Sequence, residues 1–221
     1  MEFLSIGRLK QRGQLYIMGC LGCLSCLFIS CSKEEGEASE WDNWQQRNEL
    51  YFASLQDSLS ANAAQWQRIL TYSLNTANEY AATNYIYVKK METGSGTQSP
   101  AFTDSVRVVY QGRLIPTATY PQGYVFGGTV YGQFSSATSY TAGLSVSKTV
   151  AGMSTALQQM RCGDYWRIYI PYQLGYGTAD QTNSSGVTTI PAYSTLIFDV
   201  QLVDFCAAGE TLPAWSSRQR R

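Results

Sequence analysis

Histidine is absent from this 221-residue chain, and charged residues make up only 14% of it. The absence of histidine excludes Ser-His-Asp and Cys-His nucleophile systems and any histidine-ligated metal. The 16 Lys and Arg residues equal the 16 Asp and Glu residues in number, so the formal net charge is zero. A nucleic-acid-binding protein needs a clustered excess of basic residues. The balanced charge of this chain excludes that class. We expect no metal and no cofactor.

Hydrophobic residues are plentiful at 44% of the chain, and the sequence holds 16 tyrosines and 19 glycines. This composition is sufficient for a packed core and excludes wholesale disorder. The length fits one domain with extensions, or two small domains. The excess of Tyr and Gly over charged residues favours a β-rich, extracytoplasmic protein.

Residues 1–31 have the pattern of a bacterial lipoprotein signal peptide. Three basic residues, Arg8, Lys10 and Arg12, precede an apolar run over residues 15–29. A run of about 15 residues is too short for an ordinary membrane-spanning helix and has the length of a signal-peptide hydrophobic region. The alternative is an N-terminal anchor helix that is never cleaved.

Cys31 is the expected lipidation site, because it follows the apolar run and a small residue, as in a lipobox. The acidic run after it resembles an export tag for the outer cell surface, and residues 32–40 are the expected tether. We therefore expect a lipid anchor at the outer membrane or cell surface, with a periplasm-facing anchor as the alternative. The cleavage position stays open because three other cysteines follow small or apolar residues: Cys20, Cys23 and Cys26.

Two cysteines, Cys162 and Cys206, remain after processing at Cys31. An extracytoplasmic compartment is oxidising enough for a disulfide between them. Two buried free thiols are equally compatible with the sequence.

Residues 41–83 have a helical pattern. Apolar side chains recur at steps of three and four residues, which predicts one apolar helical face: Trp41, Trp44, Tyr51, Phe52, Leu55 and Leu59. Residues 61–74 repeat this spacing more weakly, so we expect a helical hairpin or one broken helix. The helical segment either packs against the domain that follows or docks a partner.

From residue 84 the apolar period changes to two, which is typical of β-strands. One internal helix is expected at residues 153–160, before a stop at Gly163. Antiparallel strands with one short helix predict an α+β domain over residues 84–206, followed by a flexible tail at 207–221. The expected strands cover residues 84–91, 106–110, 165–170 and 195–202.

A series of motifs follows in this part of the chain. They are Val106-x-Val108-x-Tyr110-x-Gly112, Gly123-Tyr-Val-Phe126, Val150-Ala-Gly-Met153, Ile170-Pro171, Gly175-Tyr-Gly177, Ile190-Pro191 and Leu196-x-Phe198-x-Val200-x-Leu202. In this order they resemble the FK506-binding peptidyl-prolyl isomerase (FKBP) family over about residues 84–205. The resemblance implies a twisted antiparallel β-sheet wrapped over one short helix.

The resemblance also implies peptidyl-prolyl cis-trans isomerase activity. Its expected partners are proline-containing polypeptides among exported proteins, and macrolide ligands. Isomerisation must overcome the amide resonance barrier of about 18–20 kcal/mol, but no covalent bond breaks and no proton moves. A dry aromatic pocket that favours the twisted amide is sufficient. This chemistry needs no histidine.

The family pattern implies a pocket lined by catalytic and substrate-binding residues. Val150 is expected to offer its backbone N–H, and Tyr176 its hydroxyl, to the substrate. The catalytic set is Tyr110, Phe126, Tyr176 and Phe198, and the substrate-binding set is Val150, Met153 and Ile190.

Two positions depart from the family pattern. Gly127 stands where an acidic residue is expected, and Met153 stands where the family has an indole. Catalysis by positioning is sensitive to a loose site, so we expect weak activity or none. The alternatives are a binding or chaperone module that has lost turnover, and a purely structural surface lipoprotein.

Overall fold

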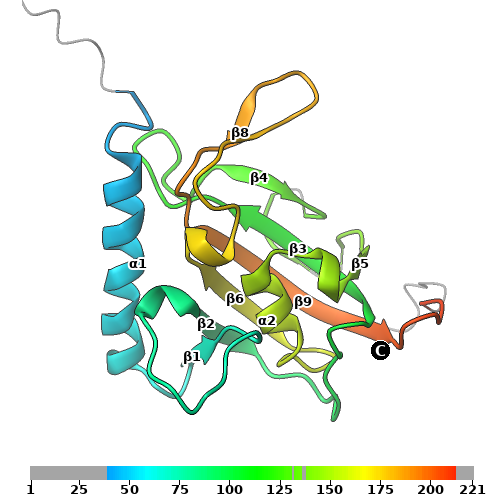
Figure 1. Cartoon of the computed structure of the whole chain (residues 1–221). Helices are drawn as coiled ribbons and strands as arrows, with labels where there is room; N and C mark the ends of the chain where they lie inside the picture. Colours follow the sequence, from blue (N-terminus) through cyan, green and yellow to red (C-terminus); the bar gives the residue numbers. More distant parts are fainter. Residues whose placement is uncertain (1–38, 131, 136–137, 213–221) are drawn as a thin grey trace, which may run out of the picture. The chain divides into compact units, whose positions relative to one another are not determined.

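The computed structural model describes residues 39–130, 132–135 and 138–212 (Figure 1). The expected signal peptide and the lipidation site Cys31 lie outside the described residues, as does most of the tether. Within these three ranges, no helix is both long and apolar enough to cross a membrane.

A seven-stranded antiparallel sheet forms the centre of the fold (Figure 1). Its strand order is β1-β2-β6-β9-β3-β4, and β5 also pairs with β3. The strands are β1 (Trp66–Leu70), β2 (Tyr85–Glu92), β3 (Ser105–Arg113), β4 (Val125–Gly128), β5 (Ala142–Ser145), β6 (Tyr165–Ile170) and β9 (Leu196–Cys206). A separate hairpin pairs β7 (Gln181–Thr182) with β8 (Thr188–Ile190).

The helices are α1 (Trp44–Ala61) and α2 (Ala151–Leu157). Short 3-10 turns lie in the connections between elements: η1 (Ala82–Asn84), η2 (Val146–Lys148) and η3 (Tyr172–Leu174). The α+β prediction of an antiparallel sheet over one short internal helix is confirmed.

One face of the sheet packs against α2, which is buried from Gly152 to Leu157. Because strand side chains alternate between faces, Val108, Ile168 and Val200 all point to this side and are buried. Gly152 lets α2 approach closely, since a Cβ there would lie 2.4 Å from Cγ2 of Ile170. The short helix is therefore held against β6.

The opposite face of the sheet is partly covered by α1. Phe52 contacts Tyr87 edge-on at 5.2 Å between ring centroids. Tyr169 lies between Tyr51, at 6.4 Å, and Trp66, on which it stacks at 5.4 Å. Burial raises the pKa of Tyr51 to about 12, so its hydroxyl stays neutral at physiological pH.

Polar contacts fix α1 to the loop before β9. The fully buried Asn48 accepts a hydrogen bond from the backbone N–H of Thr195 at 2.7 Å. The Nε1 of Trp44 donates to Oγ of Ser194 at 2.9 Å. Packing of the helical segment against the following domain, one of its two expected roles, is therefore seen for α1.

The second helical segment expected at residues 61–74 is wrong. The chain leaves α1 at Asn62 and forms β1, which pairs with β2 in the register Trp66↔Lys89 to Leu70↔Tyr85. The spacing of Trp66, Ile69 and Leu70 matches a helix, but a strand buries the same residues by placing Trp66 and Leu70 on one face and Ile69 on the other. Pairing with the edge of β2 satisfies the backbone hydrogen-bonding groups of these residues. This favours a strand over a helix. The sheet thus begins before residue 84.

Cys162 and Cys206 are both free thiols, so the disulfide alternative is wrong. Cys162 lies in the turn before β6, where its carbonyl accepts a hydrogen bond from Gly96 N–H. Cys206 ends β9 opposite Ser105, and its thiol donates to the carbonyl of Glu210 at 3.5 Å. Burial raises the pKa of the Cys162 thiol, which keeps it in the less reactive protonated form.

Candidate active site

All the pocket residues expected from the sequence line one cavity of about 460 Å³. It lies between α2, the strands β3, β4 and β9, and the β7–β8 hairpin. The expected residues that meet there are Tyr110, Phe126, Val150, Met153, Tyr176, Ile190 and Phe198.

Three aromatic rings form one wall of the cavity. Phe198 meets Phe126 edge-on at 5.5 Å and lies tilted against Tyr110 at 6.4 Å between centroids. The pairing of β3 with β9 sets this arrangement, because it places Gly112 opposite Phe198. A Cβ at Gly112 would lie 2.5 Å from the Phe126 ring and 2.7 Å from the Phe198 ring. Glycine at this position lets the two rings close over the strand.

Buried apolar side chains line the remainder. Met153 on α2 and Ile190 at the end of β8 are each 5% exposed. A ligand group that enters the cavity between Met153 and Ile190 is removed from water. This is the environment that disfavours a polar planar amide relative to a twisted one.

Val150 presents a free backbone donor. It is the N-cap of α2, and its carbonyl accepts a hydrogen bond from Ser154 N–H at 3.0 Å. Its own N–H has no acceptor in the part of the chain that the structure describes. A carbonyl in the cavity can therefore accept a hydrogen bond from Val150.

Tyr176 stands at the edge of the cavity and is 40% exposed. Partial burial, with a smaller contribution from Tyr110, raises the pKa of its hydroxyl. The group therefore stays protonated at neutral pH and can donate a hydrogen bond.

Gly127 lies beside these rings, and the space that a side chain would take at this position is open. A Cβ added there would meet no atom within 4 Å. The hydroxyl of Tyr110 has no hydrogen-bond partner among the described residues. Gly127 therefore leaves the polar end of Tyr110 without the carboxylate that the family pattern provides.

Several lining residues were not anticipated. They come from β5, the η2 turn and the β7–β8 hairpin: Leu144, Lys148, Thr149, Gln181 and Thr189. The segment before Leu144 matches no recognised motif, so no signal indicated its place. Within the described ranges, no group of three or more Cys, Asp or Glu side chains could hold a metal ion.

The chain is similar to known proteins in sequence and in fold. Residues 96–203 match the family described as FKBP-type peptidyl-prolyl cis-trans isomerase. This segment is therefore similar to the FKBP family. A crystal structure of a peptidyl-prolyl cis-trans isomerase from Pseudomonas syringae pv. tomato shares the fold. Its TM-score is 0.50 at 19% identity, over 77% of this chain and 98% of that one.

Curated proteins that resemble this chain match only part of it. The macrophage infectivity potentiator of Trypanosoma cruzi is 35% identical over 122 residues, which are 55% of this chain and 54% of that protein. The peptidyl-prolyl cis-trans isomerase Mip of Coxiella burnetii is 31% identical over 142 residues, 64% and 54% respectively. The chain thus spans about half the length of these relatives.

Proposed function

We propose that this protein is a peptidyl-prolyl cis-trans isomerase that acts on exported, proline-containing polypeptides. The observation that carries the proposal is the convergence of Tyr110, Phe126, Tyr176 and Phe198 on one cavity with Val150, Met153 and Ile190. The family match over residues 96–203 and the name of the Coxiella burnetii relative support it.

In this mechanism the proline ring enters the aromatic cavity and loses its water. The planar amide resists rotation by about 18–20 kcal/mol because of its resonance. The twisted amide has lost that resonance and is less polar, so the apolar walls favour it over the planar form. Val150 N–H and the Tyr176 hydroxyl hold the peptide carbonyls while the bond turns. No side chain gains or loses a proton.

Turnover is expected to be low for a member of this family. Gly127 supplies no carboxylate to orient Tyr110, and Met153 is a flexible floor in place of a rigid ring. These two residues favour a second candidate function, a peptide-binding or chaperone module without turnover.

An isomerisation assay with the full-length protein tests the proposal. We expect relaxation of a peptide with one X-Pro bond to become faster in proportion to protein concentration, against an uncatalysed time of about 10–100 s. A macrolide of the FK506 type should abolish the effect by filling the same cavity.

A rate equal to the uncatalysed one overturns isomerase activity. Titration of the same peptide then separates the remaining functions. Saturable binding without acceleration supports the peptide-binding module, and the absence of both peptide and macrolide binding leaves only a structural role.

We also propose that a diacyl group on Cys31 anchors the protein to the outer membrane or cell surface. The apolar run before Cys31 and the polar sequence after it support this. A relative named "Outer membrane protein MIP", from Legionella longbeachae, is 30% identical over 115 residues. Two acyl chains give stable attachment, whereas one chain binds reversibly.

Cys31→Ser is expected to move the protein from the membrane fraction to the soluble fraction and to abolish labelling by a fatty-acid analogue. Cys20→Ser is the matched control, because it changes a cysteine of the same segment but not the proposed anchor. Loss of labelling in the Cys20 variant and its retention in the Cys31 variant would refute this assignment.

A further inference from the structure

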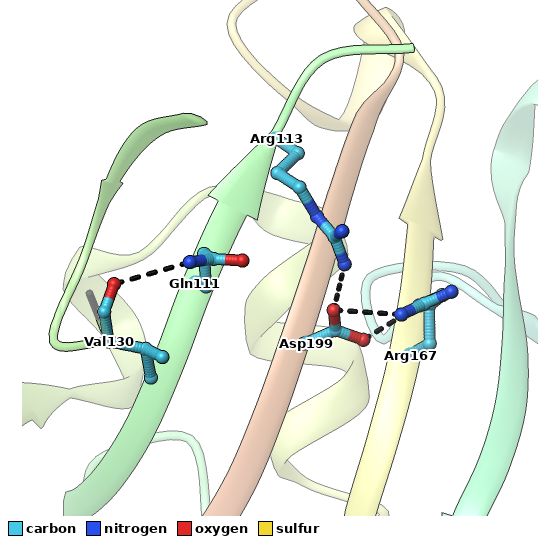
Figure 2. A network of polar contacts seen from close by, with 5 residues as sticks. All are labelled: Gln111, Arg113, Val130, Arg167 and Asp199. Atoms are coloured by element: carbon cyan, nitrogen blue, oxygen red, sulfur yellow. Dashed lines mark hydrogen bonds and ion pairs between the residues drawn. The ribbon is translucent and has the colours of Figure 1, made fainter. Parts of the chain in front are cut away.

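A second cavity, of about 740 Å³, lies on the sheet face opposite α2. Its floor is formed by neighbouring strands, with Gln111 and Arg113 on β3, Asp199 on β9 and Arg167 on β6 (Figure 2). Tyr165 and Phe134 form one side, stacked in parallel with 4.4 Å between ring centroids. The cavity lined by Tyr110, Phe126 and Phe198, called the prolyl cavity below, shares none of these residues.

Asp199 is the buried centre of this floor, with a side chain only 1% exposed. Arg167 binds it with two parallel hydrogen bonds, from Nε to Oδ1 at 2.7 Å and from Nη2 to Oδ2 at 3.0 Å. Arg113 donates a further bond from Nη2 to the same Oδ2 (Figure 2). The two-point contact from Arg167 already neutralises the Asp199 carboxylate and occupies both of its oxygens.

Arg113 is therefore the exchangeable partner of Asp199. It shares an oxygen that Arg167 already serves, and its Nε is buried without an acceptor among the described residues. A buried donor without a partner costs free energy that a suitable ligand can recover. If Arg113 turns toward an anion in the cavity, Asp199 stays paired with Arg167.

The cavity carries an excess positive charge. Its charged lining residues are two arginines and one aspartate, which leaves a net charge of +1. A guanidinium fork matches the geometry of a carboxylate. Glutamine amides also line the walls, at Gln122 and Gln133, and each offers a donor and an acceptor to a peptide backbone.

We propose that this cavity binds the carboxylate of an acidic side chain in an extended polypeptide, and that Arg113 receives it. The ligand lies on the sheet face opposite the prolyl cavity. The two cavities share no lining residue, so peptide binding and isomerisation can be tested separately.

Fluorescence anisotropy of a labelled, proline-free peptide of Glu and Ser residues tests the site in the full-length protein. We expect the peptide to bind, and the same peptide with Gln for each Glu to bind about tenfold more weakly. Arg113→Gln should weaken binding of the Glu peptide about tenfold, because one charge-assisted contact is lost. Arg161→Gln is the matched control, since it removes an exposed positive charge outside the cavity.

A surface variant covers the case in which Arg113→Gln fails to fold. Gln122 is exposed on the cavity wall, so Gln122→Glu changes charge without touching the core. It should repel the Glu peptide and weaken its binding, whereas Gln65→Glu, exposed elsewhere, should not. Equal binding of the Glu and Gln peptides, or equal weakening by a cavity variant and its control, would overturn the proposal.

Discussion

Gly112→Ala is expected to lower kcat/KM for prolyl isomerisation by about 10- to 100-fold, the loss that follows a displacement near 1 Å at a reacting site. The added methyl group would lie 2.5 Å from the Phe126 ring and 2.7 Å from the Phe198 ring. Both rings line the cavity and are in edge-on contact with each other, so a shift of one ring disturbs the other. The change therefore opens the aromatic wall without removing any of its side chains.

The isomerisation assay, with circular dichroism to show that the fold is kept, measures this effect. Gly143→Ala is the matched control, a glycine of the same sheet whose added Cβ would lie 3.5 Å from its nearest neighbour. We expect the control to retain wild-type kcat/KM. Equal rates in the Gly112 variant and the wild type would show that these rings take no part in turnover.

Asp199→Asn is expected to lower the free energy of unfolding by about 3 kcal/mol, the low end for a broken buried ion pair. The carboxylate is 1% exposed and serves two arginines, whose side chains are 13% and 32% exposed. Asparagine keeps the shape but leaves both guanidinium groups without a counter-charge. Since Arg167 is partly solvated, the loss stays below that of a wholly buried pair.

Urea unfolding measures this loss. For an m-value of about 2 kcal/mol per molar, the midpoint should fall by roughly 1.5 M. The hydrogen bonds that Arg167 donates to Asp199 raise the pKa of its guanidinium, so Arg167 stays charged at the pH of the experiment. Asp57→Asn, on the exposed side of α1, is the control and should change stability by less than about 0.5 kcal/mol. A midpoint for Asp199→Asn equal to that of the control would contradict the expectation.

The residues of the prolyl cavity could be found from the sequence because they lie within ordered motifs. Tyr110 and Phe198 lie on strands within the motifs Val106-x-Val108-x-Tyr110 and Leu196-x-Phe198-x-Val200, and Val150 and Met153 lie at the start of a short helix. The position of a residue within a strand or helix determines on which face of that element its side chain lies. The prediction of a helix at residues 61–74 was wrong because no ordered motif covers this segment. The five residues of β1 are too few for their periodicity to distinguish a helix from a strand.

The order of the motifs alone carries the resemblance to the FKBP family that implies isomerase chemistry, and the absence of histidine is compatible with it because apolar contacts can stabilise a twisted amide. Only the tertiary structure placed Arg113, Arg167 and Asp199 together on the sheet face opposite α2. Asp199 lies 32 residues from Arg167 and 86 from Arg113 along the chain. The pairing of β9 with both β3 and β6 brings these three charges into contact, and strand register over such separations follows from packing of the whole sheet.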